Sequence, residues 1–327
     1  MDVNEEQLLA WMAEEFYCNG VSQVELSNKM RVSKATVSRM LKKAVRENII
    51  KFEISVPKIM DVSLEREIEN TFEIQRAVIV DCKHLYGDDR NGIIGAAVAP
   101  IISNFLSNGD IVGLSGGESV NAVVKNLPFD EDKEITVTQL AGVDPMQTLQ
   151  SSAFFAAEQM AQKYSHCQFY PILLPSITTT RASIDVIKND LHYEKARDLF
   201  KKINVAMLGI GSILGDVPDS ALYRNGYISQ EELLYLREQG AVGVVLSNFI
   251  DKSGKAVESS ITERVISMGL EELQKIPHAI FVANGRNKVI PILAALKAGY
   301  IDVLVTDSDT AKAVLNTHTQ KGCFGND

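Results

Sequence analysis

Apolar residues recur at intervals of three and four along the first fifty positions, a spacing that predicts helices with one buried face. A first helix is expected over residues 4–19. Ser22, followed three residues later by Glu25, predicts a capping box at the start of a second helix. Ser33 is placed to cap a third helix over residues 33–48. The N-terminal region is therefore predicted to be a group of three short helices.

The pattern changes after the third helix. Residues 49–56 alternate between apolar and polar and stop at Pro57, which predicts one strand of a small wing. Beyond a helical stretch, short β-branched apolar runs alternate with helices, a pattern typical of a mostly parallel sheet covered on both faces. These runs occupy residues 77–81, 111–115, 135–140, 169–174, 205–210, 241–247, 279–284 and 302–307.

A length of 327 residues is too great for one ordinary single-core domain. The expected fold class is α/β, with an N-terminal winged helix-turn-helix joined to a mostly parallel α/β domain. We place the winged unit at residues 1–57, a linker helix at 58–76 and the α/β domain at 77–316. Residues 317–327 are polar and contain glycine, and are expected to be a disordered tail.

Positive charge is concentrated around the third predicted helix. Eight basic residues and a single acid lie between Lys29 and Lys51, although the whole chain has a formal net charge of -9. A local basic surface on an acidic chain indicates contact with a phosphate backbone, and helix-turn-helix spacing would lay the third helix in the major groove of DNA. The alternative is a solvated basic face on a structural helical domain. The expected DNA contacts are Ser33, Lys34, Ala35, Thr36, Ser38, Arg39, Lys42 and Lys43, the last two at phosphates.

Composition and residue spacing disfavour several other classes of protein. No apolar run approaches the roughly 20 residues of a membrane span, and the N-terminus lacks the order of a signal peptide. The four cysteines are scattered, which favours reduced thiols over disulfides or a zinc site. The histidines show no metal-ligand spacing, and no nucleophile motif is present. We expect a cytoplasmic protein with no metal or cofactor.

Glycine-rich turns follow two of the predicted strands. Ligands of open parallel sheets bind at the carboxyl ends of strands, where the backbone of Gly116-Gly117 could approach an anion at a helix start. The same pair is also typical of a tight strand-to-helix turn. Residues 209–212 follow another strand, but they lack G-x-G-x-x-G, which disfavours a dinucleotide site.

Asp251 and Lys288 follow two further strands. Asp251 taken alone favours a hairpin turn. Lys288 stands near a helix start, where a cation is unfavourable to the helix dipole. This position indicates a ligand role, although a solvated lysine is equally compatible.

The chain resembles the SorC family of sugar-responsive bacterial transcription regulators, and the likeness reaches about Leu315. The matching stretches are GVSQVELSNKMRVSKATVSRMLKKAVRENIIKFEI, VGLSGGESV, GIGS, GYISQEELLYLREQGAVGVVLSNFIDKSGK and VANGRNKVIPILAALKAGYIDVLVTDSDTA. The last two stretches are the specific ones, as is the order in which all five follow one another.

This resemblance implies a winged helix-turn-helix and a second domain with the fold of glucosamine-6-phosphate deaminase and ribose-5-phosphate isomerase. It also implies a tetramer and a phosphorylated sugar as effector. Asp251 would bind sugar hydroxyls, and Lys288 would bind the phosphate or a carbonyl oxygen. The implied effector-binding residues are Ser115, Gly116, Gly117, Glu118, Ser119, Gln139, Gly211, Ser212, Asp251 and Lys288.

The leading interpretation is an effector-controlled DNA-binding regulator, with repression favoured, of a carbohydrate-utilisation or related operon. Its partners would be double-stranded operator DNA, a sugar or sugar phosphate, and other copies of the chain, with no membrane. One alternative is a sugar-phosphate isomerase or deaminase with a DNA-binding head, in which Glu118 or Asp251 would be the base. Another is a constitutive DNA-binding protein whose pocket has decayed.

Overall fold

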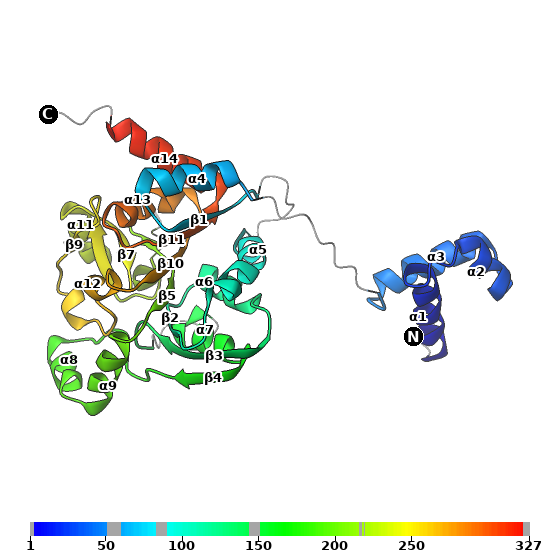
Figure 1. Cartoon of the computed structure of the whole chain (residues 1–327), viewed down its shortest axis with the longest axis horizontal. Helices are drawn as coiled ribbons and strands as arrows, with labels where there is room; N and C mark the ends of the chain where they lie inside the picture. The colour runs from blue at the N-terminus through cyan, green and yellow to red at the C-terminus, as the bar shows by residue number, and fades with distance from the viewer. Residues whose placement is uncertain are drawn as a thin grey trace. The chain divides into compact units, whose positions relative to one another are not determined.

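The computed structural model places the chain in two compact units. It describes residues 3–50, 60–82, 90–143, 151–215, 218 and 220–322. The first unit covers Met1–Pro57 and the second covers Lys58–Asp327. In Figure 1 the first is dark blue and the second runs from light blue to red. Each unit has a hydrophobic core of its own, as separate domains do.

Three short helices form the first unit: α1 (Val3–Tyr17), α2 (Gln23–Met30) and α3 (Lys34–Arg46). The Ser22 hydroxyl accepts a hydrogen bond from the backbone N–H of Glu25, whose carboxylate accepts one from the N–H of Ser22. This confirms the predicted capping box. Ser33 caps α3 through the backbone N–H of Thr36, also as predicted. Local capping chemistry therefore determines where both helices begin.

One apolar face of each helix is buried in the first unit. Leu9 and Met12 of α1 lie in the core with Leu26 of α2, and Val37 and Leu41 of α3 complete it. Each such side chain contributes about 1.5–3 kcal/mol when fully buried. Because α3 packs against both other helices through this face, its opposite face is left to solvent.

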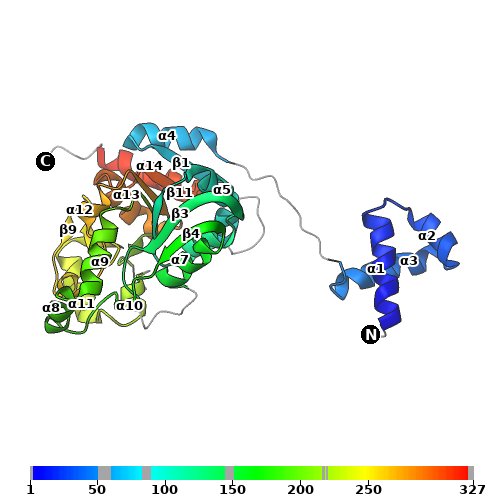
Figure 2. The same ribbon diagram turned by 60° about the horizontal axis from the view of Figure 1, so that its bottom comes forward.

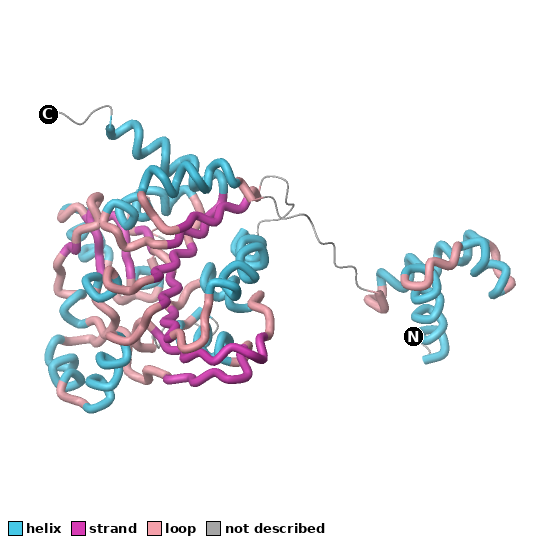
Figure 3. The backbone as a smooth tube through the Cα atoms, viewed as in Figure 1, coloured by secondary structure: helices cyan, strands magenta, loops and turns pink. Residues whose placement is uncertain are grey.

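Seven parallel strands form the centre of the second unit, which confirms the predicted sheet. Their order is β1-β11-β10-β5-β2-β3-β4, and every neighbouring pair is parallel. Figure 3 shows these strands crossing the middle of the unit, with helices around them. The strands are β1 (Arg76–Val80), β2 (Ile111–Leu114), β3 (Asp130–Gln139), β4 (Tyr164–Tyr170), β5 (Val205–Leu208), β10 (His278–Val282) and β11 (Val303–Asp307).

Helices cover both faces of this sheet (Figures 1 and 2), so alternate residues of a strand enter different cores. Ala77 and Ile79 of β1 face one core, and Val78 and Val80 face the other. α4, α9, α12, α13 and α14 line the first core, and α5, α6 and α7 line the second. None of the described helices is both long and apolar enough to cross a membrane. The helices are α4 (Val62–Phe72), α5 (Arg90–Phe105), α6 (Glu118–Lys125), α7 (Ala153–Ala161), α8 (Arg181–Lys188), α9 (Leu191–Phe200), α10 (Ala221–Arg224), α11 (Gln230–Glu238), α12 (Leu270–Leu273), α13 (Val289–Lys297) and α14 (Ser308–Gly322).

The predicted linker helix is α4, and it is part of the second unit. Its residues Leu64 and Ile68 are buried in the first core of the sheet. Glu65 and Glu69 accept hydrogen bonds from the backbone N–H groups of Ile79 (2.9 Å) and Ala77 (2.8 Å) on the outer edge of β1. α4 therefore satisfies an edge strand that would otherwise expose unpaired donors.

The apolar run at residues 241–247 was predicted as a strand of the parallel sheet, and this is wrong. It forms β7 (Ala241–Val245) of a separate antiparallel sheet, in the order β6-β7-β8-β9. Only Leu246 and Ser247 separate β7 from β8, and so short a loop can join antiparallel strands only. The other strands are β6 (Gly211–Ser212), β8 (Asn248–Asp251) and β9 (Ala256–Val257).

Three other predictions concern the ends of elements. The run at 169–174 is strand only to Tyr170, because the next residue is a proline, which has no N–H for the ladder. The predicted wing strand lies mainly on residues 51–56, outside the described residues, and residues 49–50 form a bend. The tail was expected to be disordered, but α14 continues to Gly322, so this is wrong for residues 317–322. The hydroxyl of Thr317 bonds the preceding turn there.

Gly95 lets α5 and α6 pack in close contact. A Cβ atom at this position would lie 2.4 Å from the backbone carbon and oxygen of Ala122. Alanine is favoured over glycine in a helix by about 1 kcal/mol, but overpacking a rigid contact costs about 1–3 kcal/mol. The steric cost wins because the obstructing atoms are backbone.

We expect Gly95→Ala to lower the free energy of unfolding of the second unit by up to about 2 kcal/mol in urea denaturation, which is the steric cost less the gain in helix propensity. Gly209→Ala is the matched control, since its Cβ would meet only the oxygen of Val282 at 3.7 Å. The control should be neutral or slightly stabilising. Equal behaviour of the two variants would show that α5 and α6 can separate without cost.

Candidate functional site

A cavity of about 280 Å³ opens at the carboxyl ends of the central strands. The segments that follow β2, β3, β5 and β10 all contribute to its wall, and the small antiparallel sheet contributes Gly211 and Val244. Seven of the ten predicted effector-binding residues line it: Ser115, Gly116, Gly117, Glu118, Ser119, Gly211 and Lys288.

The turn after β2 requires both of its glycines. A Cβ atom at Gly116 would lie 2.7 Å from the oxygen of Ser151 and 2.8 Å from the nitrogen of Ala153. Gly117 has a φ of 125°, which side-chain-bearing residues rarely adopt. Gly117 is also the N-cap of α6, and as a glycine it has no side chain with which to cap the helix. The first backbone N–H groups of α6 therefore start at the cavity wall, where the helix dipole favours an anion.

Gln139 and Ser212, also predicted to bind the effector, are not among the residues that line the cavity. Gln139 is fully buried and ties two segments together, because its Oε1 accepts the backbone N–H of Ile172 at 2.8 Å. The hydroxyl of Ser212, also fully buried, accepts the N–H of Leu214 at 3.2 Å. Both side chains serve the fold.

Asp251 is not among the residues that line the cavity either, so its effector contact stays a prediction. Its Oδ1 accepts hydrogen bonds from the N–H and hydroxyl of Ser253 (2.8 and 2.6 Å) and the N–H of Lys255 (2.9 Å). Partial burial acts to raise the pKa of Asp251, but these hydrogen bonds outweigh it and hold the pKa below its usual value. The carboxylate therefore stabilises the turn that follows β8.

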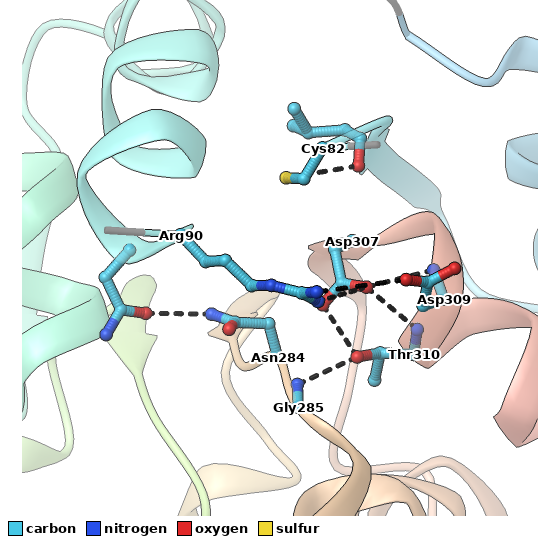
Figure 4. A network of polar contacts seen from close by, with 9 residues as sticks. Cys82, Arg90, Asn284, Gly285, Asp307, Asp309 and Thr310 are labelled. Carbon is cyan, nitrogen blue, oxygen red and sulfur yellow. Dashed lines mark hydrogen bonds and ion pairs between the residues drawn. The ribbon is translucent and has the colours of Figure 1, made fainter. Parts of the chain in front are cut away.

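A chain of polar contacts holds the loop before Lys288 (Figure 4). The backbone N–H of Gly285 donates to Thr310 Oγ1 at 2.8 Å, and that hydroxyl donates to Asp307 Oδ2 at 2.7 Å. Asp307 is only 1% exposed, and a guanidinium nitrogen of Arg90 lies 3.7 Å from its Oδ1. The buried charge is thus compensated, and it fixes Gly285 through Thr310.

Cys82 lies near this network and is not poised as a nucleophile. Burial, followed by the negative charge of Asp307, raises the pKa of its thiol to about 11, although Arg90 lowers it. The thiol is therefore protonated at neutral pH, and the thiolate is the reactive form of cysteine.

Residues that the sequence left unassigned also line the cavity. They come from segments far apart in the chain, and no local motif predicts them. Among them are the polar residues Asn91, Ser176, Arg224, Ser247 and Asn284. The SorC resemblance itself marks Asn284 as a departure, because the common A-G-G before the lysine is Ala283-Asn284-Gly285 in this chain.

The side chains predicted to contact DNA lie on α3 and its N-cap, and most are accessible. Five are exposed: Ser33, Lys34, Ala35, Arg39 and Lys42. Thr36, Ser38 and Lys43 are half-buried. Lys43 forms an ion pair with Glu5 of α1, so part of its charge is already neutralised. Arg39 donates to Thr36 Oγ1 at 3.4 Å, which turns it toward the start of the helix.

A helix-turn-helix unit with a basic third helix, together with an α/β unit holding a polar cavity, defines a ligand-responsive DNA-binding protein. Residues 57–316 match the Sugar-bind family, described as a sugar-binding domain. The deoxyribonucleoside regulator of Bacillus subtilis (strain 168) is 27% identical, over 97% of this chain and 99% of that one. The transcriptional regulator LsrR of Escherichia coli O139:H28 is 29% identical over 96% of each chain.

The fold also matches a solved structure along nearly its whole length. The full-length sorbitol operon regulator SorC from Klebsiella pneumoniae has a TM-score of 0.75 at 23% identity, covering 96% of this chain and 99% of that one. The chain belongs to the SorC family of sugar-responsive transcription regulators. It is a DNA-binding regulator, since the relatives it matches are regulators and not enzymes.

Thr310→Val should destabilise the second unit by about 1–3 kcal/mol in urea denaturation, because it leaves the N–H of Gly285 without its acceptor. Thr317→Val on the same helix is the control, as it loses only a bond to the carbonyl of Ala313 one turn earlier. A loss no larger than that of the control would mean that the Gly285 loop is held by other contacts.

Proposed function

We propose that the chain represses a carbohydrate-related operon, and that a phosphorylated sugar bound in the cavity releases it from DNA. The observation that carries this proposal is that the N-terminus of α6, which has a glycine as its N-cap, and Lys288 line one cavity. The names of the deoxyribonucleoside and sorbitol operon relatives support a carbohydrate operon. A structural neighbour from Vibrio fischeri, named as a transcriptional repressor, supports repression.

The phosphate would bind between the Gly116-Gly117 turn and Lys288. Backbone N–H groups of the first turn of α6 supply donors, and the Lys288 ammonium supplies a compact positive charge. Glu118 follows this turn, but it is exposed and can turn toward water. Ser115 and Gly211 would contact the sugar. A volume of about 280 Å³ suits a monosaccharide phosphate better than a dinucleotide.

Operator DNA would bind the exposed face of α3. Ser33, Lys34 and Ala35 open the helix and would approach base edges together with Thr36, Ser38 and Arg39, whereas Lys42 and Lys43 would neutralise phosphates. We expect Lys43 to contribute less than Lys42, since its ion pair with Glu5 must be broken or shared.

The regulator would act in the cytoplasm as a homo-oligomer, a tetramer being the state that the family resemblance implies. The effector must bind one arrangement of the DNA-binding units better than another, because only differential affinity can shift the equilibrium between them. Such coupling is typically about 1–3 kcal/mol, or about 5- to 150-fold in affinity for DNA.

Arg39→Ala should weaken operator binding by about 5- to 150-fold, since a base or phosphate contact by arginine is worth about 1–3 kcal/mol. The measurement is a gel-shift or anisotropy titration with the chain's own promoter region at fixed salt. Lys29→Ala is the charge-matched control, because Lys29 lies on α2 and is paired with Glu15 at 2.9 Å. Equal operator affinities for the two variants would show that α3 is not part of the DNA-binding interface.

Lys288→Ala should leave operator affinity unchanged and weaken phosphate binding by about 10- to 100-fold, the value of a charge-assisted hydrogen bond. Calorimetry with inorganic phosphate and with ribose, deoxyribose, fructose and sorbitol phosphates would measure this. Lys297→Ala, an exposed position at the end of α13, is the matched control. Wild-type affinity in Lys288→Ala would rule out the proposed phosphate site.

A further inference from the structure

We propose that Asn91 is a further effector-binding residue, whose side-chain Nδ2 donates a hydrogen bond to an oxygen of the bound phosphate. This assignment rests on the proposed function, because it concerns the same cavity. It adds a residue from α5, which neither the sequence motifs nor the family resemblance placed at the site.

Asn91 is the second residue of α5, and it lines the cavity together with Gly117 and Lys288. Its side chain reaches two other segments of the wall. Asn91 Oδ1 accepts a hydrogen bond from the hydroxyl of Ser119 at 2.9 Å and one from Nδ2 of Asn284 at 2.8 Å. α5, the first turn of α6 and the loop before Lys288 therefore meet at one oxygen atom.

These two hydrogen bonds determine which end of the Asn91 amide is available. A carbonyl oxygen has two lone pairs, and both are occupied in this arrangement. The amide is planar, so fixing Oδ1 also fixes the direction of the two N–H bonds of Nδ2. Within the described part of the chain, the polar contacts of the Asn91 side chain all go to Oδ1. Nδ2 is left as an oriented donor on a residue of the cavity wall.

The neighbours of Asn91 indicate that its partner is an anion oxygen. Ser119 lies in the first turn of α6, next to the backbone N–H groups at the positive end of the helix dipole. Its hydroxyl donates to Asn91, so Ser119 positions the amide and reaches the effector through it. Lys288, on the same wall, can only donate. A group that accepts several hydrogen bonds and carries negative charge fits this set of donors, and phosphate is such a group.

The backbone next to Asn284 is anchored as well. The next residue, Gly285, is the residue that Thr310 and Asp307 anchor, as Figure 4 shows. The donor from Asn284 to Asn91 is therefore fixed from α14, and the donor from Ser119 is fixed by α6. Such support is what a binding group needs to keep its geometry before the ligand arrives.

The Asn91→Asp variant tests the role of Asn91 in phosphate binding separately from its role in holding the three segments together. The new carboxylate keeps an oxygen that accepts from Ser119 and Asn284, so the bridge between the three segments remains. The Nδ2 donor is replaced by a negatively charged oxygen. We expect thermal stability in phosphate-free buffer to equal that of the wild type, whereas affinity for inorganic phosphate, measured by calorimetry on the full chain, falls at least about tenfold.

Asn108→Asp is the matched control. It adds the same charge and keeps an oxygen that accepts one backbone N–H, that of Glu134 at 3.0 Å, but Asn108 does not line the cavity. Its phosphate affinity should equal that of the wild type. Asn91→Ala is the second variant, because it removes the donor without adding charge. It should also lose about tenfold, since a hydrogen bond to a charged group is involved.

The outcomes distinguish the two proposals. If the wild type binds phosphate and Lys288→Ala does not, while both Asn91 variants bind like the wild type, the role of Asn91 is refuted and the phosphate site stands. If Asn91→Ala loses stability but keeps phosphate affinity, Asn91 is only a structural bridge. If the wild type and Lys288→Ala bind phosphate equally, the proposed function itself fails.

Discussion

Burial of both faces of one parallel sheet is the constraint on which the second unit depends. A parallel sheet needs helices on both sides, and alternate residues of each strand supply two separate cores. Because every central strand runs the same way, the segments after β2, β3, β5 and β10 all emerge at one edge. The cavity forms at the carboxyl ends of the strands, because the loops meet at this end and remain at the surface.

Much of this architecture could be predicted from the sequence, because it is encoded locally. The starts of two helices could be predicted from their capping residues, which are Ser22 with Glu25 for α2 and Ser33 for α3. The apolar runs announce strands. The failures have local causes too: a two-residue loop at Leu246 forces β7 into an antiparallel sheet, and a proline stops β4 at Tyr170. Strand direction depends on loop length, which the apolar pattern does not show.

The candidate site was less accessible to sequence reasoning. The Gly116-Gly117 turn and Lys288 could be found, because each lies in the segment between a strand and the helix that follows it. Asp251 occupies a similar position in the sequence, yet its carboxylate is used by the turn that follows it. Asn91 could not be found, since its place at the site results from contacts with residues 28 and 193 positions away. Groups assembled over such separations are determined by the tertiary fold.

The contact between α4 and β1 has a consequence for assembly. The carboxylates of Glu65 and Glu69 occupy the outward N–H groups of Ile79 and Ala77, so another strand cannot pair along that side of β1. At the other end of the sheet, β4 pairs only with β3 among the described strands. The sheet is thus asymmetric in its capacity for extension: a neighbouring copy could continue its hydrogen-bond ladder from β4 but not from β1. Strand addition through β4 alone could join two copies but could not continue into an open-ended assembly.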